Sequence, residues 1–427
     1  MNQETVTQDP TTRKWPRRYT MLGLLLVAML LCYIDRIIVS LAAIEMQKEF
    51  GWDDAKKGLV LSVFFAGYLA TQILGGFLSN RYGGRTVFLL AVLLWSVFTV
   101  LTPVAAYISF SALIAARIML GVGEGAAFPA AFNLIHRWMP PTERSRSVGG
   151  LSTASSIGTV ATLLTAGYLI GTFGWPSVFY LFGSMGFIWV AFWIWKIPAM
   201  PEKSEDEWDA GHDAKPAPIP WKLLTTHPAV IMIYGLSVCM GCVSFTLASW
   251  LPSYFVDSFG LSLTQAGLYS ILPWLALAVT TLLGGAYADK RIAAGVTRIR
   301  VRKTVTIFGL ALIAISCLTL VFAPNVAVAV LVICCLFGGQ GIAVVGYSPT
   351  AADLLPEHGD VFFGIAASAG SLGALFSVSA TGVLVEETGS YDGLFLSLAG
   401  LCTLTALLYL MIGQAEPLTR IKKALDV

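Results

Sequence analysis

Residues 75–85 read Gly-Gly-Phe-Leu-Ser-Asn-Arg-Tyr-Gly-Gly-Arg, and residues 284–291 read Gly-Gly-Ala-Tyr-Ala-Asp-Lys-Arg. In both stretches a glycine pair, which permits close packing of helices, precedes a short polar and cationic turn. The first stretch follows the second long apolar run of the chain, and the other follows the eighth. Generic cytoplasmic loops are the alternative, but the shared glycine pair and spacing favour a chain built from two similar halves.

The composition indicates a membrane protein. Of the 427 residues, 56% are hydrophobic and only 12% are charged, and the mean hydropathy is +0.75. Soluble globular proteins of ordinary composition do not reach these values. A helix needs about 20 apolar residues to cross a hydrocarbon core roughly 30 Å thick. We therefore predict an all-α membrane protein with twelve transmembrane helices, at residues 20–42, 57–79, 86–107, 110–136, 147–170, 176–197, 228–256, 264–287, 304–323, 326–352, 361–385 and 392–413.

The positive charges lie mainly on one side of these predicted helices. All but five of the 27 lysines and arginines fall before the first helix, after the twelfth, or at the ends of even-numbered helices and in the loops that follow them. The exceptions are Lys48, Lys56 and Lys57 in the first loop and Arg36 and Arg117 within helices. Because cytoplasmic loops are enriched in Lys and Arg, we expect both termini in the cytoplasm. This orientation requires an even number of helices.

The segments outside the helices define the expected organisation. We predict a cytoplasmic N-terminal segment over 1–19, a six-helix bundle over 20–198, a cytoplasmic linker over 199–226, a second bundle over 227–413 and a cytoplasmic tail over 414–427. The linker is rich in acids and then in proline, as solvated linkers are. The first nineteen residues resemble neither a secretory signal nor a transit peptide. We expect an integral multi-pass protein of the plasma membrane, or of the inner membrane in a bacterium.

The loop motif and five further motifs resemble a known family. The pattern Gly76-x-x-x-Asn80-Arg81-x-Gly83-Gly84-Arg85 resembles the loop signature of the major facilitator superfamily, with Asn80 where Asp is usual. The further motifs resemble the anion:cation symporter family, which includes bacterial galactonate, glucarate and hexuronate permeases, sialin, and eukaryotic phosphate and ascorbate transporters. They are Tyr33-Ile-Asp35-Arg36, residues 64–72, Gly121-Val-Gly123-Glu124-Gly125, residues 141–147 and residues 174–180.

This resemblance implies two six-helix bundles with the substrate site between them at mid-membrane. The second half matches more loosely. Where many family members have an asparagine pair, this chain has Ala351 or Thr350, and Ser368. Substrate identity is therefore the property on which the resemblance says least.

Two arginines within predicted helices point to an anionic substrate. A guanidinium stays charged and fits a planar carboxylate with two hydrogen bonds. We expect Arg36 and Arg117 to bind the anion, with Tyr33, three residues before Arg36, adding a hydroxyl. The alternative is an Arg36 that is locked to Asp35 or to a neighbouring helix for packing.

Glu124 is the expected proton-coupling residue, and Asp35 is the second candidate. Arg117 and Glu124 are seven residues apart, which places them on nearly the same helical face. An anion that engages Arg117 or Arg36 would divert a cation from Glu124 and raise its affinity for a proton. The alternative is a static ion pair of Arg117 with Glu124. Gly121 and Gly125 are expected to let this helix approach a neighbour closely.

The remaining candidates for the cavity wall are Tyr68, Gln72, Tyr347 and Ser368. The seven cysteines lie in apolar segments without metal-ligand spacing and are interpreted as packing residues. We expect no metal, no cofactor, no nucleic-acid partner and no enzymatic activity. The expected partners are a small organic anion, protons or possibly Na⁺, and membrane lipid. We expect the protein to be a monomer.

The sequence predicts a secondary active transporter that couples uptake of a small organic anion, a sugar acid or related carboxylate, to protons by alternating access. A phosphate transporter or a Na⁺-coupled anion transporter of the same family is the first alternative. A drug exporter is disfavoured because residues 148–170 lack the Gly-Pro dipeptide of such antiporters. A membrane receptor or assembly partner is the alternative outside transport.

Overall fold

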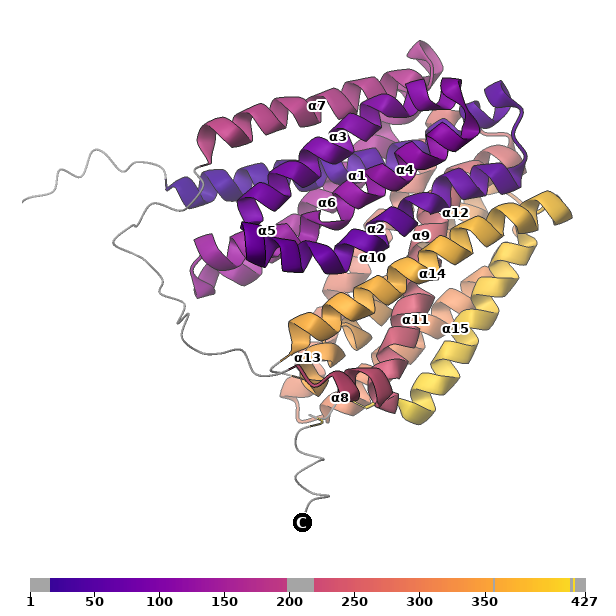
Figure 1. Ribbon diagram of the computed structural model, residues 1–427. Helices are drawn as coiled ribbons and strands as arrows, with labels where there is room; N and C mark the ends of the chain where they lie inside the picture. Colours follow the sequence, from indigo (N-terminus) through magenta and orange to yellow (C-terminus); the bar gives the residue numbers. More distant parts are fainter. Residues whose placement is uncertain (1–15, 198–218, 356–357, 415–417, 419–427) are drawn as a thin grey trace, which may run out of the picture.

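The computed structural model describes residues 16–197, 219–355, 358–414 and 418, and its regular elements are helices (Figure 1). They are α1 (Arg17–Phe50), α2 (Asp54–Tyr82), α3 (Gly84–Ile108), α4 (Phe110–Gly125), α5 (Ala127–Trp138), α6 (Pro141–Phe173), α7 (Pro176–Lys196), α8 (Trp221–Thr226), α9 (Pro228–Phe259), α10 (Leu263–Ala293), α11 (Arg298–Leu320), α12 (Val326–Tyr347), α13 (Thr350–Leu354), α14 (Gly359–Thr388) and α15 (Asp392–Ile412).

Within the described residues, twelve spans are long and apolar enough to cross a membrane, when α4 and α5 are counted as one span and the short α8 and α13 are left out. The predicted number is confirmed. The predicted linker, N-terminal segment and tail lie for the most part outside the described residues, so the domain boundaries proposed there remain predictions.

The helices form two bundles, α1–α7 and α9–α15 (Figure 1). Within the first bundle α1 packs on α6 and α2 on α4; within the second, α9 packs on α14 and α11 on α12. The bundles meet where α2 contacts α14 and where α6 contacts α10. The predicted arrangement of two six-helix bundles is confirmed.

The two bundles approach each other most closely at one end, which we call the closed end. At this end α2 begins, and the chain passes from α9 to α10. A Cβ on Gly58 of α2 would lie 3.0 Å from the Cα of Gly382 of α14. The Asp54 backbone N–H donates to Glu386 Oε2 at 2.8 Å, and Gly167 packs against the Leu263 carbonyl. In Figure 1 the bundles separate towards the opposite end, where α1 begins and α15 ends.

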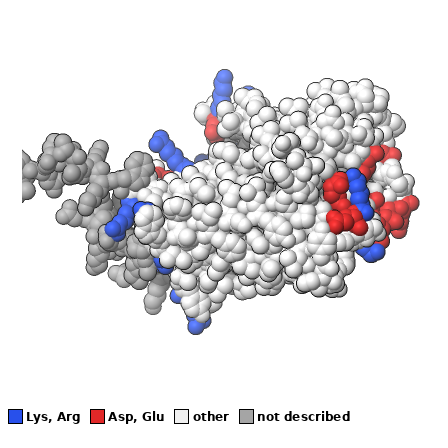
Figure 2. Space-filling model, turned by 90° about the horizontal axis from the view of Figure 1, so that it is seen from above, with Lys and Arg blue, Asp and Glu red and all other residues white. Residues whose placement is uncertain are grey.

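The surface between the two ends suits a lipid environment. Figure 2 shows a wide face without charged side chains, flanked by charged groups at both ends, with acidic residues gathered at the end away from the grey segments. Large apolar side chains are exposed along the spans, including Leu282, Phe376 and Met411. Such exposure is unfavourable in water and favourable against acyl chains.

Two predicted helices are interrupted. The run predicted at 326–352 ends as α12 at Tyr347, and the chain forms α13 from Thr350 after a turn. The run at 110–136 was expected to be continuous, but the chain turns at Ala126 and forms α4 and α5. The Ala126 N–H bonds to the Glu124 carbonyl rather than to that of Val122, and the Thr71 hydroxyl donates to the Val122 oxygen instead, at 2.8 Å. Hydropathy does not reveal this turn, because the donor that compensates for it comes from another helix.

Glycines bring α2 and α4 into backbone contact. A Cβ on Gly121 would collide with the Phe64 carbonyl oxygen, and one on Gly125 with the Tyr68 carbonyl oxygen. On α2, a Cβ on Gly67 would likewise collide with the Ile118 carbonyl oxygen. The close packing predicted for Gly121 and Gly125 is confirmed, and it brings side chains of α1, α2 and α4 into reach of one another.

This packing predicts that Gly121→Ala lowers the thermal unfolding temperature of the purified protein, because overpacking typically destabilises by about 1 to 3 kcal/mol. Gly149→Ala in α6 is the matched control, since nothing lies within 4 Å of its Cβ position. Thermal unfolding followed by intrinsic fluorescence compares the two variants. Equal unfolding temperatures would contradict the assignment of Gly121 to a tight contact.

Candidate functional site

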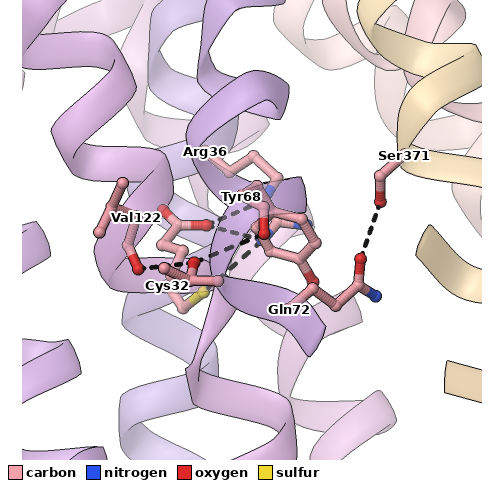
Figure 3. A network of polar contacts seen from close by, with 8 residues as sticks. Cys32, Arg36, Tyr68, Gln72, Val122 and Ser371 are labelled. Atoms are coloured by element: carbon pink, nitrogen blue, oxygen red, sulfur yellow. Dashed lines mark hydrogen bonds and ion pairs between the residues drawn. The ribbon is translucent and has the colours of Figure 1, made fainter. Parts of the chain in front are cut away.

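A buried ion pair joins α1 to α4. The Arg36 guanidinium contacts Glu124 Oε2 through Nη2 at 2.7 Å and through Nε at 3.0 Å (Figure 3). The two side chains are 7% and 0% exposed. The static ion pair of Arg117 with Glu124, which was the alternative from the sequence, is not the pair that forms: Glu124 pairs with Arg36. Spacing along α4 places Arg117 and Glu124 on one face, but α1 brings Arg36 closer.

Aromatic rings surround the Arg36 guanidinium. Its Cζ atom lies 4.7 Å from the ring centroid of Tyr33, 4.8 Å from that of Tyr68 and 5.2 Å from that of Phe64. A ring face attracts a cation, most strongly where water is excluded. Tyr33 and Tyr68 thus contact the cation with their rings, whereas the sequence reasoning expected a contribution from the Tyr33 hydroxyl.

Arg117 is a second buried cation, with only weak compensation. Its side chain is among the largest that are fully buried, and its Nε donates to the Val60 carbonyl at 3.3 Å. Its Cζ atom lies 5.4 Å from the Phe64 ring centroid. Nη1 has no hydrogen-bond partner within the described part of the chain. Arg117 therefore holds a buried donor that is not satisfied by the described residues.

Two acceptor atoms in the same cluster also have no partner among the described residues. One is Oε1 of Glu124, and the other is Oδ1 of Asp35, which is 2% exposed and lies near Thr99 of α3. Buried polar atoms are seldom left unpaired in folded proteins. Two arginines and two acids make the cluster formally neutral, yet three of its polar atoms have no hydrogen-bond partner among the described residues.

Gln72 continues the polar path to the second bundle. It lies one helical turn after Tyr68 on α2 and accepts a hydrogen bond from Ser371 of α14 at 3.2 Å and a longer one from Ser368 at 3.5 Å. In Figure 3 Gln72 points away from the Arg36 cluster and towards Ser371. Sequence reasoning missed Ser371, although it lies three residues after Ser368 and so shares its helical face.

The second bundle offers fewer polar groups. Tyr347, at the end of α12, is half-buried, and no hydrogen bond joins it to the Arg36 cluster in the described structure. Gln340, also on α12, donates to the Ser244 hydroxyl of α9, and its Oε1 has no partner among the described residues. We add Gln340 to the candidates for the cavity wall. Among the described residues, no group of three His, Cys, Asp or Glu side chains is arranged to hold a metal ion.

Comparison with known proteins identifies the family. The family model described as Major Facilitator Superfamily matches residues 24–362. A probable anion transporter 4, chloroplastic, of Oryza sativa subsp. japonica is 37% identical over 91% of this chain and 67% of that protein. From Arabidopsis thaliana, the ascorbate transporter, chloroplastic, is 34% identical over 96% of this chain and 77% of that protein, and the sodium-dependent phosphate transport protein 1, chloroplastic, is 33% identical over 97% and 84%.

Solved structures share the fold at low sequence identity. A bacterial homologue of the human lysosomal transporter Spinster, in an inward-facing and occupied conformation, superposes with a TM-score of 0.75 at 19% identity, over 93% of this chain and 97% of that one. The D-xylose-proton symporter gives a TM-score of 0.76 at 16% identity, over 93% and 98%.

The ion pair predicts a pH-dependent defect in Arg36→Met. Removal of one partner of a buried pair typically costs about 3 to 5 kcal/mol, because the other charge remains unpaired. Lowering the pH supplies the proton that neutralises Glu124, so the loss in unfolding temperature should shrink from pH 8 to pH 5. The double variant Arg36→Met/Glu124→Gln should lack this pH dependence. A loss that is equal at both pH values would show that Glu124 is not the group left unpaired.

Proposed function

This chain belongs to the Major Facilitator Superfamily, and we propose that it carries a small organic anion across the membrane together with protons, by alternating access between its two bundles. It is a transporter and not an enzyme. The observation that carries the proposal is how the charges of the cluster are paired. Glu124 Oε2 lies 2.7 Å from Arg36 Nη2, while Nη1 of the buried Arg117 has no hydrogen-bond partner among the described residues.

An anion and Glu124 compete for the same cation. Within the cluster, Arg117 offers hydrogen bonds to the anion, and a carboxylate that also engages Arg36 displaces Glu124. The displaced carboxylate remains buried without a partner, which favours uptake of a proton. Anion and proton each raise the affinity for the other, since linkage of this kind is reciprocal.

The charge balance of the cluster supports the same coupling. Arg36, Arg117, Asp35 and Glu124 sum to zero, so an added monovalent anion leaves one uncompensated negative charge in a low-dielectric site, and one proton removes it. Moving one negative charge inward against about 100 mV costs roughly 2.3 kcal/mol. One proton cancels this cost, and additional protons make accumulation favourable. Asp35, the second acid, is the candidate for a further proton.

We propose a sugar acid or a related hydroxylated carboxylate as the substrate. The cationic cluster suits the carboxylate. Gln72, Ser368 and Ser371, where the bundles meet, offer neutral donors and acceptors that suit hydroxyl groups. A relative named as an ascorbate transporter supports this class. We further propose that both ends of the chain lie in the cytoplasm, as the positive charges near the termini favour. The closed end then faces outward, and we propose the plasma membrane, or the inner membrane of a bacterium, as the location.

Na⁺-coupled phosphate transport is the second candidate. The relative named as a sodium-dependent phosphate transport protein favours it, and two arginines bind phosphate as readily as carboxylate. Purified protein in vesicles should distinguish the candidates by uptake of sugar acids, ascorbate and phosphate, with either a proton or a Na⁺ gradient imposed. We expect accumulation of a carboxylate with protons alone. Accumulation that requires Na⁺ would support the second candidate, and absence of flux with any substrate would favour a receptor.

Glu124→Gln should abolish proton-driven accumulation and leave counterflow exchange partly intact. The amide retains the shape and the hydrogen bond to Arg36 but does not release a proton. The affinity of the wild type for the anion should rise as pH falls, and that of the variant should not change. Glu45→Gln, which alters a surface carboxylate paired with Lys48, is the matched control. Concentrative uptake by Glu124→Gln would exclude Glu124 as the coupling residue.

A further inference from the structure

Lys57 is the only buried lysine among the described residues, and its burial needs an explanation. It lies in the first turn of α2 with 1% of its side chain exposed. Nζ lies 2.7 Å from Asp54 Oδ1 in its own helix and 3.9 Å from Asp257 Oδ2 of α9. It also lies 4.8 Å from the ring centroid of Trp250. Lysine is almost never fully buried unless it is paired. The buried ammonium therefore depends on nearby carboxylates to offset the free energy lost on its removal from water.

Lys57 shares one face of α2 with the cation-binding aromatics. Phe64 and Tyr68 follow it by seven and eleven residues, which returns each to within about 20° of Lys57 around the helix. Phe64 contacts both Arg36 and Arg117, and Tyr68 contacts Arg36. Three cations therefore lie in series along this face of α2, one of them its own and two from α4 and α1. Lys57 comes first, then Arg117 at the level of Val60, then Arg36 at the level of Phe64 and Tyr68.

Asp257 covers Lys57 from the second bundle. Its carboxylate is 45% exposed and accepts a hydrogen bond from the Tyr391 hydroxyl at 2.7 Å. Nearby, the Asp54 backbone N–H donates to Glu386, which also belongs to the second bundle. Separation of the bundles at the closed end would withdraw Asp257 and leave Lys57 facing the opening with a single acidic partner, Asp54.

We propose that Lys57 is the first anion-binding residue on the path from the closed end, and that Asp257 takes the place of the substrate's anionic group when this end closes. The proposal rests on the function proposed above. In the open state an incoming carboxylate binds the Lys57 ammonium and then passes inward along α2 to Arg117 and Arg36. In the closed state Asp257 supplies the negative charge, so the lysine is not left with Asp54 as its only counter-charge.

A purely structural role makes the opposite prediction. If Lys57 only fastens the bundles together, its loss favours the state that is open at this end, and the KM for substrate presented there falls. If Lys57 captures the anion, its loss raises that KM. Asp257→Asn weakens the same contact without removing the cation, so it lowers the KM on this side under both views. Lys57→Gln and Asp257→Asn are therefore matched variants with opposite expected signs.

The experiment measures KM separately on each side of the membrane, in vesicles with the closed end facing outward and in inverted vesicles. We expect Lys57→Gln to raise the KM on the closed-end side about ten-fold, the effect of one charge-assisted hydrogen bond, and to change the KM on the other side by no more than about two-fold. Lys57→Arg should retain most of the wild-type affinity. A lower KM for Lys57→Gln, or a KM equal to that of the wild type, overturns the proposal.

A binding measurement separates failure of this proposal from failure of the proposed function. Absence of transport by the wild type overturns the function. The same anions are then added to purified Asp257→Asn and to Lys57→Gln/Asp257→Asn, and the shift in unfolding temperature is compared, since a ligand stabilises the state it binds. The capture role requires a larger shift in the single variant. Equal shifts, including the absence of any shift in both, overturn it.

Discussion

A charge in a low-dielectric interior needs a compensating charge, and the Arg36–Glu124 pair satisfies this requirement at the centre of the first bundle. The two side chains come from α1 and α4, and the rings of α2 complete the surroundings of the guanidinium. The pair forms only if the three helices lie close together. Gly67, Gly121 and Gly125 make this approach possible, because backbone replaces side chain at the contact between α2 and α4. The charge cluster thus depends on close helix packing.

Helix α2 links the central cluster to the contact between the bundles. One face of it carries Lys57 at the closed end, Phe64 and Tyr68 at the cluster, and Gln72 opposite α14. A change in how the bundles meet therefore alters the surroundings of each position on this face. Competition for cations recurs along it, since Asp257 lies against Lys57 and Glu124 binds Arg36. In both places an acid of the protein holds a cation that also suits an anionic substrate.

Much of this arrangement was predictable from local patterns. The apolar runs predicted the twelve spans, the glycine-rich repeat predicted two halves, and the small-residue pair predicted the close packing of α4. The partner of Glu124 was not predictable in this way, because Arg36 is distant in sequence and only the packing of α1 brings it near. For the same reason, the sequence did not predict the turn at Ala126 or the hydrogen bond that Thr71 donates to the Val122 carbonyl. Ser371 was within reach of helical periodicity and was overlooked, whereas Lys57 looked like an ordinary loop lysine.

The sequence by itself determined the class of the protein, its number of spans and its stock of intramembrane charges, because hydropathy and charge are properties of residues and of short segments. The tertiary structure decided which charges pair, which donors and acceptors remain free, and which end of the molecule is closed. Those properties depend on distances of a few ångströms between side chains of different helices. Such distances follow from the packing of whole helices, and a change of one helical turn would give each charge a different partner.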